Sequence, residues 1–145
     1  MTSSFAYFDT SVLVRRYVKE DGSDRARYLT RRKLIVCSAI SPLETMSAVK
    51  RYHTAGKITD KAYNVILTRF QTDRARWRLV SVSQEILDLA QTHVSSLNVR
   101  TLDAIHLATA KSCETRFPHP LPFVTADANQ RDAALKLNLE VVFVE

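Results

Sequence analysis

Four acidic residues stand at positions where their carboxylates can meet. Asp9, Glu44 and Asp127 each follow a short apolar segment with the pattern of a strand, and Asp103 lies at the start of a predicted helix. In a parallel sheet the carboxyl ends of the strands share one edge, where α/β folds place their ligands. If the helix of Asp103 begins at the same edge, all four carboxylates converge there.

Each acid also has a purely structural explanation. Asp9 and Asp127 stand at expected helix starts, where aspartate is a common N-cap. Glu44 follows Ser41 by three residues and would complete a capping box with it, after a proline at the first helical position. Asp103 falls in the first turn of its helix, where the helix dipole favours a carboxylate. Capping explains each acid singly, but it does not explain their convergence.

Carboxylates held close together repel one another, and a divalent cation relieves that repulsion. Mg²⁺ suits such a set, because it prefers oxygen ligands and keeps sites for water and phosphate. The sequence has no cysteine or histidine cluster with the spacing of a softer-metal site. A bound ion of this kind can polarise a phosphate, lower the pKa of its water and stabilise a leaving oxygen. The acids therefore predict metal-dependent phosphodiester hydrolysis, with the number of ions left open.

The elements that must position these acids alternate between strand and helix. Apolar runs predict strands near residues 5–8, 34–37, 79–82, 121–125 and 141–144. Helical spacing predicts the segments between them, including a helical hairpin from Ser41 to about Trp77 and a buried helix from Thr101. Continuous apolar strands separated by helices indicate a sheet covered on both faces. We predict one domain over residues 1–145, a three-layer α/β/α fold with a mainly parallel sheet of roughly five strands.

The composition of the chain predicts the class of its partner and its location in the cell. The 145 residues carry 21 Lys and Arg against 15 Asp and Glu, a net charge of +6, which favours a polyanionic partner. The two cysteines, Cys37 and Cys113, lie in apolar segments and are expected to be buried and reduced. No apolar run approaches the length of a membrane span, so we expect a cytoplasmic protein with no membrane contact.

Several residues near the acids have weaker claims to a role. Arg15 and Arg16 follow Asp9, and Arg100 precedes the helix of Asp103, so these three arginines are candidates for contact with RNA phosphates. His106 follows Asp103 by three residues. We interpret it as a packing histidine, because water activated by a metal needs no histidine base.

Four segments together carry a family resemblance. They are YFDTS at 7–11, SPLE at 41–44, LDAIHLA at 102–108 and VTAD at 124–127. In this order, and over almost the whole chain, they resemble the PIN domain, in particular toxins of the VapC type. One departure is visible, since residues 128–131 lack the aromatic side chain common shortly after the last acid of that family.

The resemblance implies a function more specific than the acids alone predict. It implies an endoribonuclease that depends on Mg²⁺ or Mn²⁺ and acts as the toxin of a toxin-antitoxin pair. It further implies inhibition by a cognate antitoxin protein and assembly as a homodimer. Carried onto this sequence, it makes the four acids the metal-binding and water-activating set. It also makes the hydroxyls of Ser11 and Thr125 supports for the carboxylates or the metal-bound water.

Two other classes of function remain open. A PIN-like scaffold that holds RNA or protein without cutting would be indicated by a missing acid, and none of the four is missing. A phosphatase or a phosphoacceptor receiver would also place an aspartate after its first strand. The DxD pattern of haloacid-dehalogenase phosphatases fails, because Ser11 stands where the second acid belongs. A receiver needs a lysine after its last strand, where this sequence has Val144 and Glu145.

Overall fold

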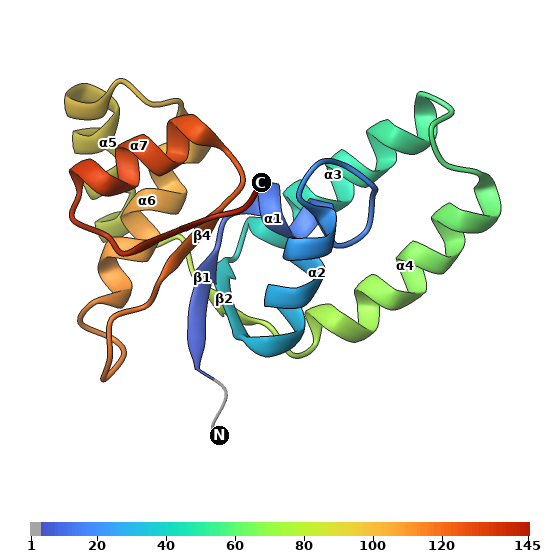
Figure 1. Ribbon diagram of the computed structural model, residues 1–145. Helices are drawn as coiled ribbons and strands as arrows, with labels where there is room; N and C mark the ends of the chain where they lie inside the picture. The colour runs from blue at the N-terminus through green and yellow to red at the C-terminus, as the bar shows by residue number, and fades with distance from the viewer. Residues whose placement is uncertain (1–3) are drawn as a thin grey trace.

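A single parallel sheet forms the centre of the computed structural model, which describes residues 4–145. Its strands are β1 (Phe5–Phe8), β2 (Leu34–Ser38), β3 (Arg78–Val80), β4 (Phe123–Thr125) and β5 (Val141–Phe143). They lie in the order β3-β2-β1-β4-β5, and every neighbouring pair is parallel (Figure 1). The predicted five-stranded parallel sheet is confirmed, although β3 and β4 are shorter than the apolar runs that predicted them.

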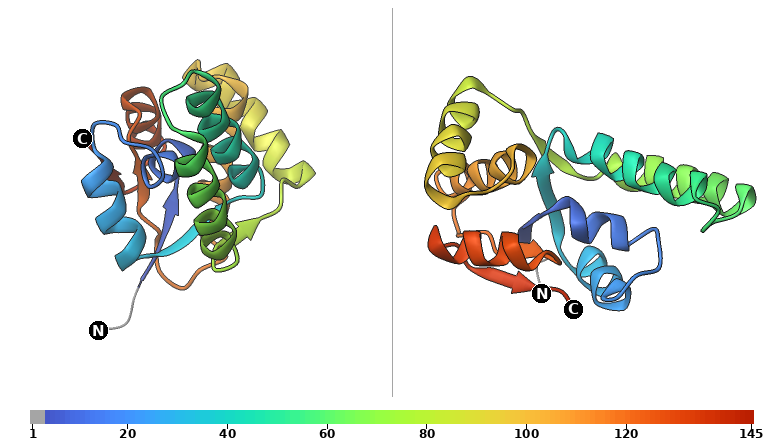
Figure 2. Two further views of the ribbon diagram at one scale, coloured as in Figure 1. Left: turned by 90° about the vertical axis from the view of Figure 1, so that its right-hand side faces the viewer. Right: turned by 90° about the horizontal axis from the view of Figure 1, so that it is seen from above.

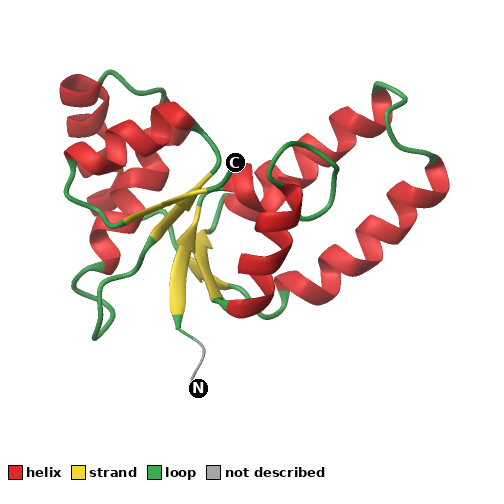
Figure 3. Ribbon diagram, in the orientation of Figure 1, coloured by secondary structure: helices red, strands yellow, loops and turns green. Residues whose placement is uncertain are grey.

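Seven helices cover the sheet in the described residues, and they lie on both of its faces (Figure 3). They are α1 (Thr10–Arg15), α2 (Ser23–Arg32), α3 (Ser41–Thr54), α4 (Asp60–Arg74), α5 (Gln84–Leu97), α6 (Thr101–Cys113) and α7 (Ala128–Lys136). Alternate strand residues enter separate cores. Ala6 and Phe8 pack with α1 to α4, whereas Tyr7 packs with α5 to α7. The predicted three-layer arrangement is therefore confirmed.

Helix α6 is the most buried of the seven. Eight of its thirteen residues are buried, including Ala104, Leu107 and Ala108, which are fully buried. It packs between α5, α7 and the sheet, as its apolar character on more than one face predicts. Because packing fixes this helix on several sides, its first turn, which carries Asp103, has a well-defined position at the edge of the sheet.

The α3–α4 hairpin extends away from the rest of the molecule (Figure 2). Thr59 caps α4 by accepting a hydrogen bond from the backbone N–H of Ala62 at 3.0 Å. The base of α4 is anchored by Phe70, whose ring meets the edge of Trp77 at a centroid distance of 5.6 Å. Trp77 thus packs the hairpin against the core. None of the helices within residues 4–145 is long and apolar enough to cross a membrane.

The predicted capping box at the start of α3 is wrong. Ile40, and not Ser41, is the N-cap, and no side chain caps this helix. Ile40 already has helical backbone angles (φ −81°, ψ −16°), so Ser41 lies inside the first turn, where a serine does not adopt the extended backbone of a cap. The Ser41 hydroxyl is buried without a hydrogen-bond partner in the described part of the chain. The Glu44 side chain is therefore free of the capping role and turns elsewhere.

Candidate acidic site at the carboxyl edge of the sheet

Strands β1 and β4 are neighbours, and together they position Asp9. The backbone N–H of Asp9 donates to the carbonyl of Val124 at 2.9 Å, which continues the β1–β4 pairing by one residue. The Asp9 side chain does not cap α1. Its Oδ2 instead accepts hydrogen bonds from Thr125 at 2.7 Å and from Ser11 at 3.1 Å. The two hydroxyls expected to support a carboxylate therefore fix Asp9, which is only 5% exposed.

Asp127 ends the short connection from β4 to α7. Its Oδ1 accepts from the backbone N–H groups of Asn129 at 2.8 Å and Gln130 at 3.3 Å, so it caps α7 as its position predicts. Its own N–H donates to the Thr125 hydroxyl at 3.1 Å. Capping occupies one carboxylate oxygen, and Thr125 links the backbone of Asp127 to the side chain of Asp9.

Asp103 approaches the other acids from the first turn of α6. Burial raises its pKa to about 6, and the negative charges of Asp9, Asp127 and, more weakly, Glu44 add to that rise against an opposing contribution from His106. The other three predicted acids therefore lie close enough to Asp103 for their charges to act on it. Convergence at this edge is what the sequence pattern predicted.

Gln130 had no predicted role, yet it fixes the helix that carries Asp103. Its side chain is 1% exposed, and its Nε2 donates to the main-chain carbonyl of Asp103 at 3.2 Å, tying α7 to α6. A glutamine in a helix is usually exposed, so its residue type gives no sign of this contact.

Glu44 is held by a histidine and a threonine. Its Oε1 accepts from Thr10 Oγ1 at 2.8 Å and lies 2.7 Å from His106 Nε2. The other ring nitrogen of His106 lies 2.7 Å from the Tyr7 hydroxyl. His106 is 2% exposed, as a packing histidine would be, but our interpretation missed that it contacts the acidic site. Burial lowers the His106 pKa, but the hydrogen bond to Glu44 and the charges of Asp9, Glu44 and Asp103 outweigh burial and raise it overall.

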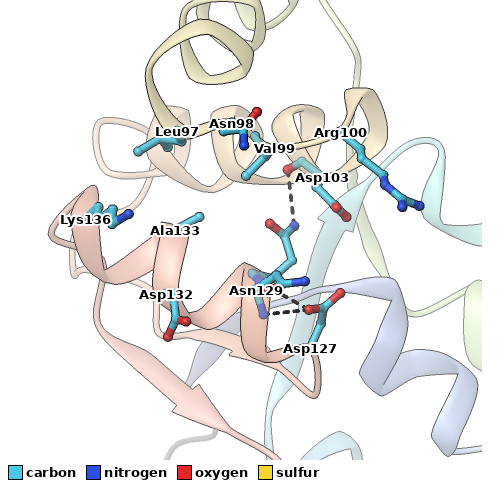
Figure 4. Close-up of a pocket in the computed structure, with 11 residues that line it drawn as sticks. Leu97, Asn98, Val99, Arg100, Asp103, Asp127, Asn129, Asp132, Ala133 and Lys136 are labelled. Carbon is cyan, nitrogen blue, oxygen red and sulfur yellow. Dashed lines mark hydrogen bonds between the residues drawn. The ribbon is translucent and has the colours of Figure 1, made fainter.

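Two cavities flank the acids. One, of about 570 Å³, lies between the start of α6 and α7, with Asp103 and Asp127 on facing sides and Arg100 and Asp132 also in its wall (Figure 4). The other, of about 420 Å³, opens beside α1 and α3 and is lined by Glu44 among other residues. Solvent and ligands can thus approach the acids through either cavity.

The three candidate arginines have different environments. Arg100 lines the cavity of Asp103, as expected for a residue beside the site. Arg15 lines the second cavity, but its guanidinium also pairs with Glu20 at 3.1 Å. Arg16 is not at the site: its Nε donates to Asp73 of α4 at 2.9 Å, because the last turn of α1 directs it toward the hairpin. The prediction for Arg16 is wrong.

The donor atoms suit a hard divalent cation. Within residues 4–145, no three His, Cys, Asp or Glu side chains already stand close enough to form a metal site. The available donors are nevertheless carboxylate oxygens, which Mg²⁺ and Mn²⁺ prefer. The raised pKa of Asp103 reflects burial first and then repulsion by Asp9 and Asp127, and a bound cation would offset both. His106 is engaged through both ring nitrogens and so does not compete as a ligand. The residues fit the ion that the sequence predicts.

Comparisons with known proteins identify the family of this chain. The PIN domain family model matches residues 6–137. Ribonuclease VapC46 of Mycobacterium tuberculosis is 34% identical over 137 residues, which cover 94% of this chain and 95% of that protein.

Solved structures share the fold at low sequence identity. A toxin-antitoxin complex from Klebsiella pneumoniae has a TM-score of 0.61 at 22% identity, covering 84% of this chain and 86% of its own. VapBC2 from Rickettsia felis, bound to a DNA fragment from its promoter, has a TM-score of 0.65 at 14% identity, covering 97% and 99%. With the matched family model and the 34% identical relative, these findings show that the chain belongs to the PIN-domain family.

Proposed function

We propose that this protein is a divalent-metal-dependent endoribonuclease and the toxin of a toxin-antitoxin pair. The observation that carries the proposal is that Asp9, Asp127 and Glu44 lie near enough to Asp103 for their charges to raise its pKa, in addition to the larger effect of burial. The 34% identical relative is named a ribonuclease, which supports RNA as the substrate. PIN-domain nucleases of the VapC type generally depend on a divalent metal, which supports the cofactor.

The ion, Mg²⁺ or Mn²⁺, would supply a water of lowered pKa and neutralise charge on the scissile phosphate. Asp9, Asp103, Asp127 and Glu44 would hold it. Ser11 and Thr125 fix the Asp9 carboxylate, so little reorganisation is needed when the site is loaded. Gln130 likewise fixes the main chain at Asp103 through its hydrogen bond to the Asp103 carbonyl. The chain's own contribution is thus to position oxygen ligands and the phosphate.

The substrate would enter along the two cavities, one lined by Asp103 and Asp127 and the other by Glu44. Arg100 in one wall and Arg15 in the other are suited to the phosphates on either side of the scissile bond. A single strand fits this arrangement better than a duplex, because an unpaired backbone can bend into a concave site.

Two protein partners complete the proposal. One is a cognate antitoxin, supported by the similarity of the fold to toxin-antitoxin complexes. The other is a second copy of the chain in a homodimer. Co-expression with the neighbouring gene product, followed by light scattering of the free and bound protein, tests both.

Cleavage of labelled RNA tests the activity directly. The wild-type protein is incubated with Mg²⁺, with Mn²⁺ and with EDTA, alongside Asp9→Asn, Asp103→Asn and the control Asp132→Asn. Asp132 lines the same cavity as Asp103 but pairs with Arg131 at 3.0 Å. We expect cleavage with either ion, none with EDTA and none by the first two variants. Equal cleavage by all three variants would refute the proposal, and RNA affinity without products under any ion would favour a non-cleaving scaffold.

A further inference from the structure

A buried chain of hydrogen bonds runs from the sheet to the acidic site. It joins Tyr7 of β1, His106 of α6 and Glu44 of α3, with 2.7 Å between the Tyr7 hydroxyl and His106 Nδ1 and 2.7 Å between His106 Nε2 and Glu44 Oε1. Tyr7 is fully buried and His106 is 2% exposed. Three elements far apart in the sequence therefore meet in one polar contact, which is buried at Tyr7 and part-buried at Glu44.

The hydrogen bonds among Tyr7, His106 and Glu44 indicate which of their atoms donate and which accept. The Tyr7 phenol is buried and neutral, and in the described residues its O–H has His106 Nδ1 as its only side-chain partner. When the imidazole is neutral, a donating Tyr7 hydroxyl leaves Nδ1 as the acceptor and Nε2 as the donor to Glu44 Oε1. Thr10 donates to the same oxygen. Oε1 thus receives two hydrogen bonds, whereas Oε2 receives none from residues 4–145.

We infer that Tyr7 and His106 are positioning residues that fix Glu44 with one oxygen turned inward and the other presented to the acidic edge. This inference rests on the proposed function and adds two residues to it. A carboxylate oriented in this way would bind a divalent ion through one oxygen and lose little freedom on binding. Tyr7 sets the tautomer of His106, and His106 sets the rotamer of Glu44.

The test uses three variants and a matched control in the full chain. Tyr7→Phe removes the hydroxyl, His106→Gln keeps an N–H donor near Glu44, and His106→Ala removes it. His93→Ala is the control, because His93 is also buried, at 4% exposure, but its Nε2 has no partner in the described residues. The readouts are the ¹⁵N shifts of His106 without metal, and Mn²⁺ affinity without RNA.

At a pH high enough for His106 to be neutral, we expect the wild type to show the Nε2–H tautomer and Tyr7→Phe to show a mixture of tautomers. We expect His106→Ala to weaken Mn²⁺ binding about tenfold or more, as loss of a ligand-orienting hydrogen bond generally does. His106→Gln should restore part of that affinity, and His93→Ala should leave it unchanged. Equal Mn²⁺ affinity in His106→Ala and His93→Ala, or an Nδ1–H tautomer in the wild type, would overturn the inference.

If His106→Ala does not fold, Tyr7→Phe and His106→Gln decide the question through the same two measurements. Neither measurement needs RNA cleavage. A wild type that fails to cut RNA therefore contradicts the proposed function and leaves the positioning role to be judged by the tautomer and the Mn²⁺ affinity.

A separate observation concerns the outward face of α2. Residues 23–33 hold five cations against the single Asp24, a net +4 out of the chain's +6. The inward face is apolar and buried through Ala26 and Leu29. Among the four arginines of α2, only Arg27 forms an ion pair within the described residues, with the exposed Asp24 at 3.3 Å. Most of the basic surplus therefore lies on one helix and not beside the acids.

An exposed aromatic ring lies within this basic face. Tyr28 is 50% exposed, and the guanidinium carbons of Arg32 and Arg25 lie 5.2 and 5.9 Å from its ring centroid. Tyr28, Arg27, Arg31 and Arg32 line a concavity of about 460 Å³, together with Asp24, which pairs with Arg27. Surfaces that bind single-stranded nucleic acid combine cations with exposed aromatic rings, because phosphates pair with the cations and bases stack on the rings.

From this second observation we propose that the α2 face, defined by Arg25, Arg27, Tyr28, Arg31 and Arg32, docks single-stranded RNA outside the acidic site. This proposal also rests on the proposed function, because it extends the contact with the same substrate. Its effect would be on the binding of long RNA and not on the chemical step.

The test compares two triple variants with equal loss of charge. One is Arg27→Gln/Arg31→Gln/Arg32→Gln on α2, and the control is Lys61→Gln/Arg69→Gln/Arg74→Gln on the exposed side of α4. Binding of a labelled 30-nucleotide RNA is measured against salt in an Asp103→Asn background, which needs no cleavage. The salt slope is the slope of the logarithm of the binding constant against the logarithm of the salt concentration, and each phosphate contact of a single strand contributes roughly 0.7 to its magnitude. We expect the α2 variant, which loses three cations, to reduce that magnitude by about 2 and the control to leave it unchanged.

In the active protein, the α2 variant should raise KM for long RNA severalfold, leave kcat unchanged and leave cleavage of a five-nucleotide RNA unaffected. Tyr28→Ala should weaken long-RNA binding without changing the salt slope. Equal salt slopes for both triple variants would overturn the docking proposal. So would equally tight binding of polyglutamate, which would assign the face to an acidic protein segment.

Discussion

At the scale of single residues, three of the acids divide their two oxygens between structure and site. Asp9 accepts through Oδ2, Asp127 through Oδ1 and Glu44 through Oε1. In the described residues the hydrogen bonds of each acid fall on that one oxygen. A role in holding the fold and a role in binding an ion are therefore compatible in the same side chain.

Asp103 differs from these acids, because its carboxylate is repelled and receives no hydrogen bond in the described part of the chain. Its raised pKa means that the ionised form costs folding free energy above about pH 6, and that this cost disappears as the pH falls toward 4. In EDTA at pH 7, we expect Asp103→Asn to raise the free energy of unfolding by about 1 kcal/mol after solvent screening, or roughly 3 °C in Tm.

Thermal melts of Asp103→Asn and Asp132→Asn in EDTA measure this effect. Asp132 lines the same cavity but is paired with Arg131, so its substitution should bring no gain. A lower Tm for Asp103→Asn than for wild type would contradict the expected repulsion.

At the scale of elements, a polar contact ties α1 to the base of the α3–α4 hairpin. Asp73 of α4 accepts from Arg16 at 2.9 Å and from Tyr17 at 2.7 Å, next to the edge-on packing of Tyr17 and Phe70. The contact uses an arginine that the sequence placed among the RNA ligands. Since α1 begins directly after Asp9, a firm position for α1 also helps to fix the acidic edge.

This contact makes part of the stability depend on pH. Burial raises the Asp73 pKa, but the hydrogen bonds from Arg16 and Tyr17 and the charge of Arg16 outweigh burial and lower the pKa below its usual value of 3.8. The contribution is therefore complete above about pH 4 and is lost as the pH falls through the lowered pKa. We expect Asp73→Asn to cost about 1–2 kcal/mol at pH 7.

Urea unfolding at pH 7, 5, 4 and 3 tests this dependence. The difference between wild type and Asp73→Asn should be constant down to pH 5 and shrink below pH 4. Asp60→Asn is the control, because Asp60 lies on the same helix with a 94% exposed side chain and pairs only with His53 among the described residues. A difference that does not change with pH would mean that Asp73 contributes packing and not charge.

At the scale of the whole molecule, acidic and basic groups occupy different regions. The four acids gather at the carboxyl edge of the sheet, whereas α2 carries most of the excess positive charge. The acidic site is assembled from β1, α3, α6 and the β4–α7 connection, which together span most of the chain. An ion that binds there therefore links distant segments and should stabilise the entire fold.

Mn²⁺ should accordingly raise the stability of the full chain by linkage. At a free concentration one hundred times its Kd, a single site gives about 2.7 kcal/mol, or roughly 8 °C in Tm for a domain of this size. EDTA should reverse the shift, and Asp9→Asn/Asp103→Asn should abolish it. Melting curves with and without Mn²⁺ provide the measurement, and an equal shift in the double variant would place the ion elsewhere.

Much of the fold follows from local pattern. Apolar runs of strand length and helical spacing of apolar residues predicted all five strands and the helices between them, because burial on both faces leaves a periodic signature in the chain. Thr59 and Ser83 cap their helices, since each lies in extended backbone directly before a helix. The candidate acids could be predicted for the same reason: parallel strands bring their carboxyl ends to one edge.

Contacts between distant segments had no such signature. Ser41 and Glu44 have the spacing of a capping box, but the turn at Ile40 starts the helix earlier and releases Glu44 toward His106. Gln130 and Arg16 are ordinary helix residues in the sequence, and only the packing of α7 on α6 and of α1 on α4 gives them partners.

The sequence by itself determined the fold class and the four acids that can meet, because both depend on residue type and on spacing along one chain. The tertiary structure decided which oxygen of each acid is occupied, that His106 holds Glu44, and that Arg16 faces away from the site. These outcomes depend on distances between elements, and those distances are set by how complete helices pack on the sheet. That packing is a property of the assembled core and not of any segment within it.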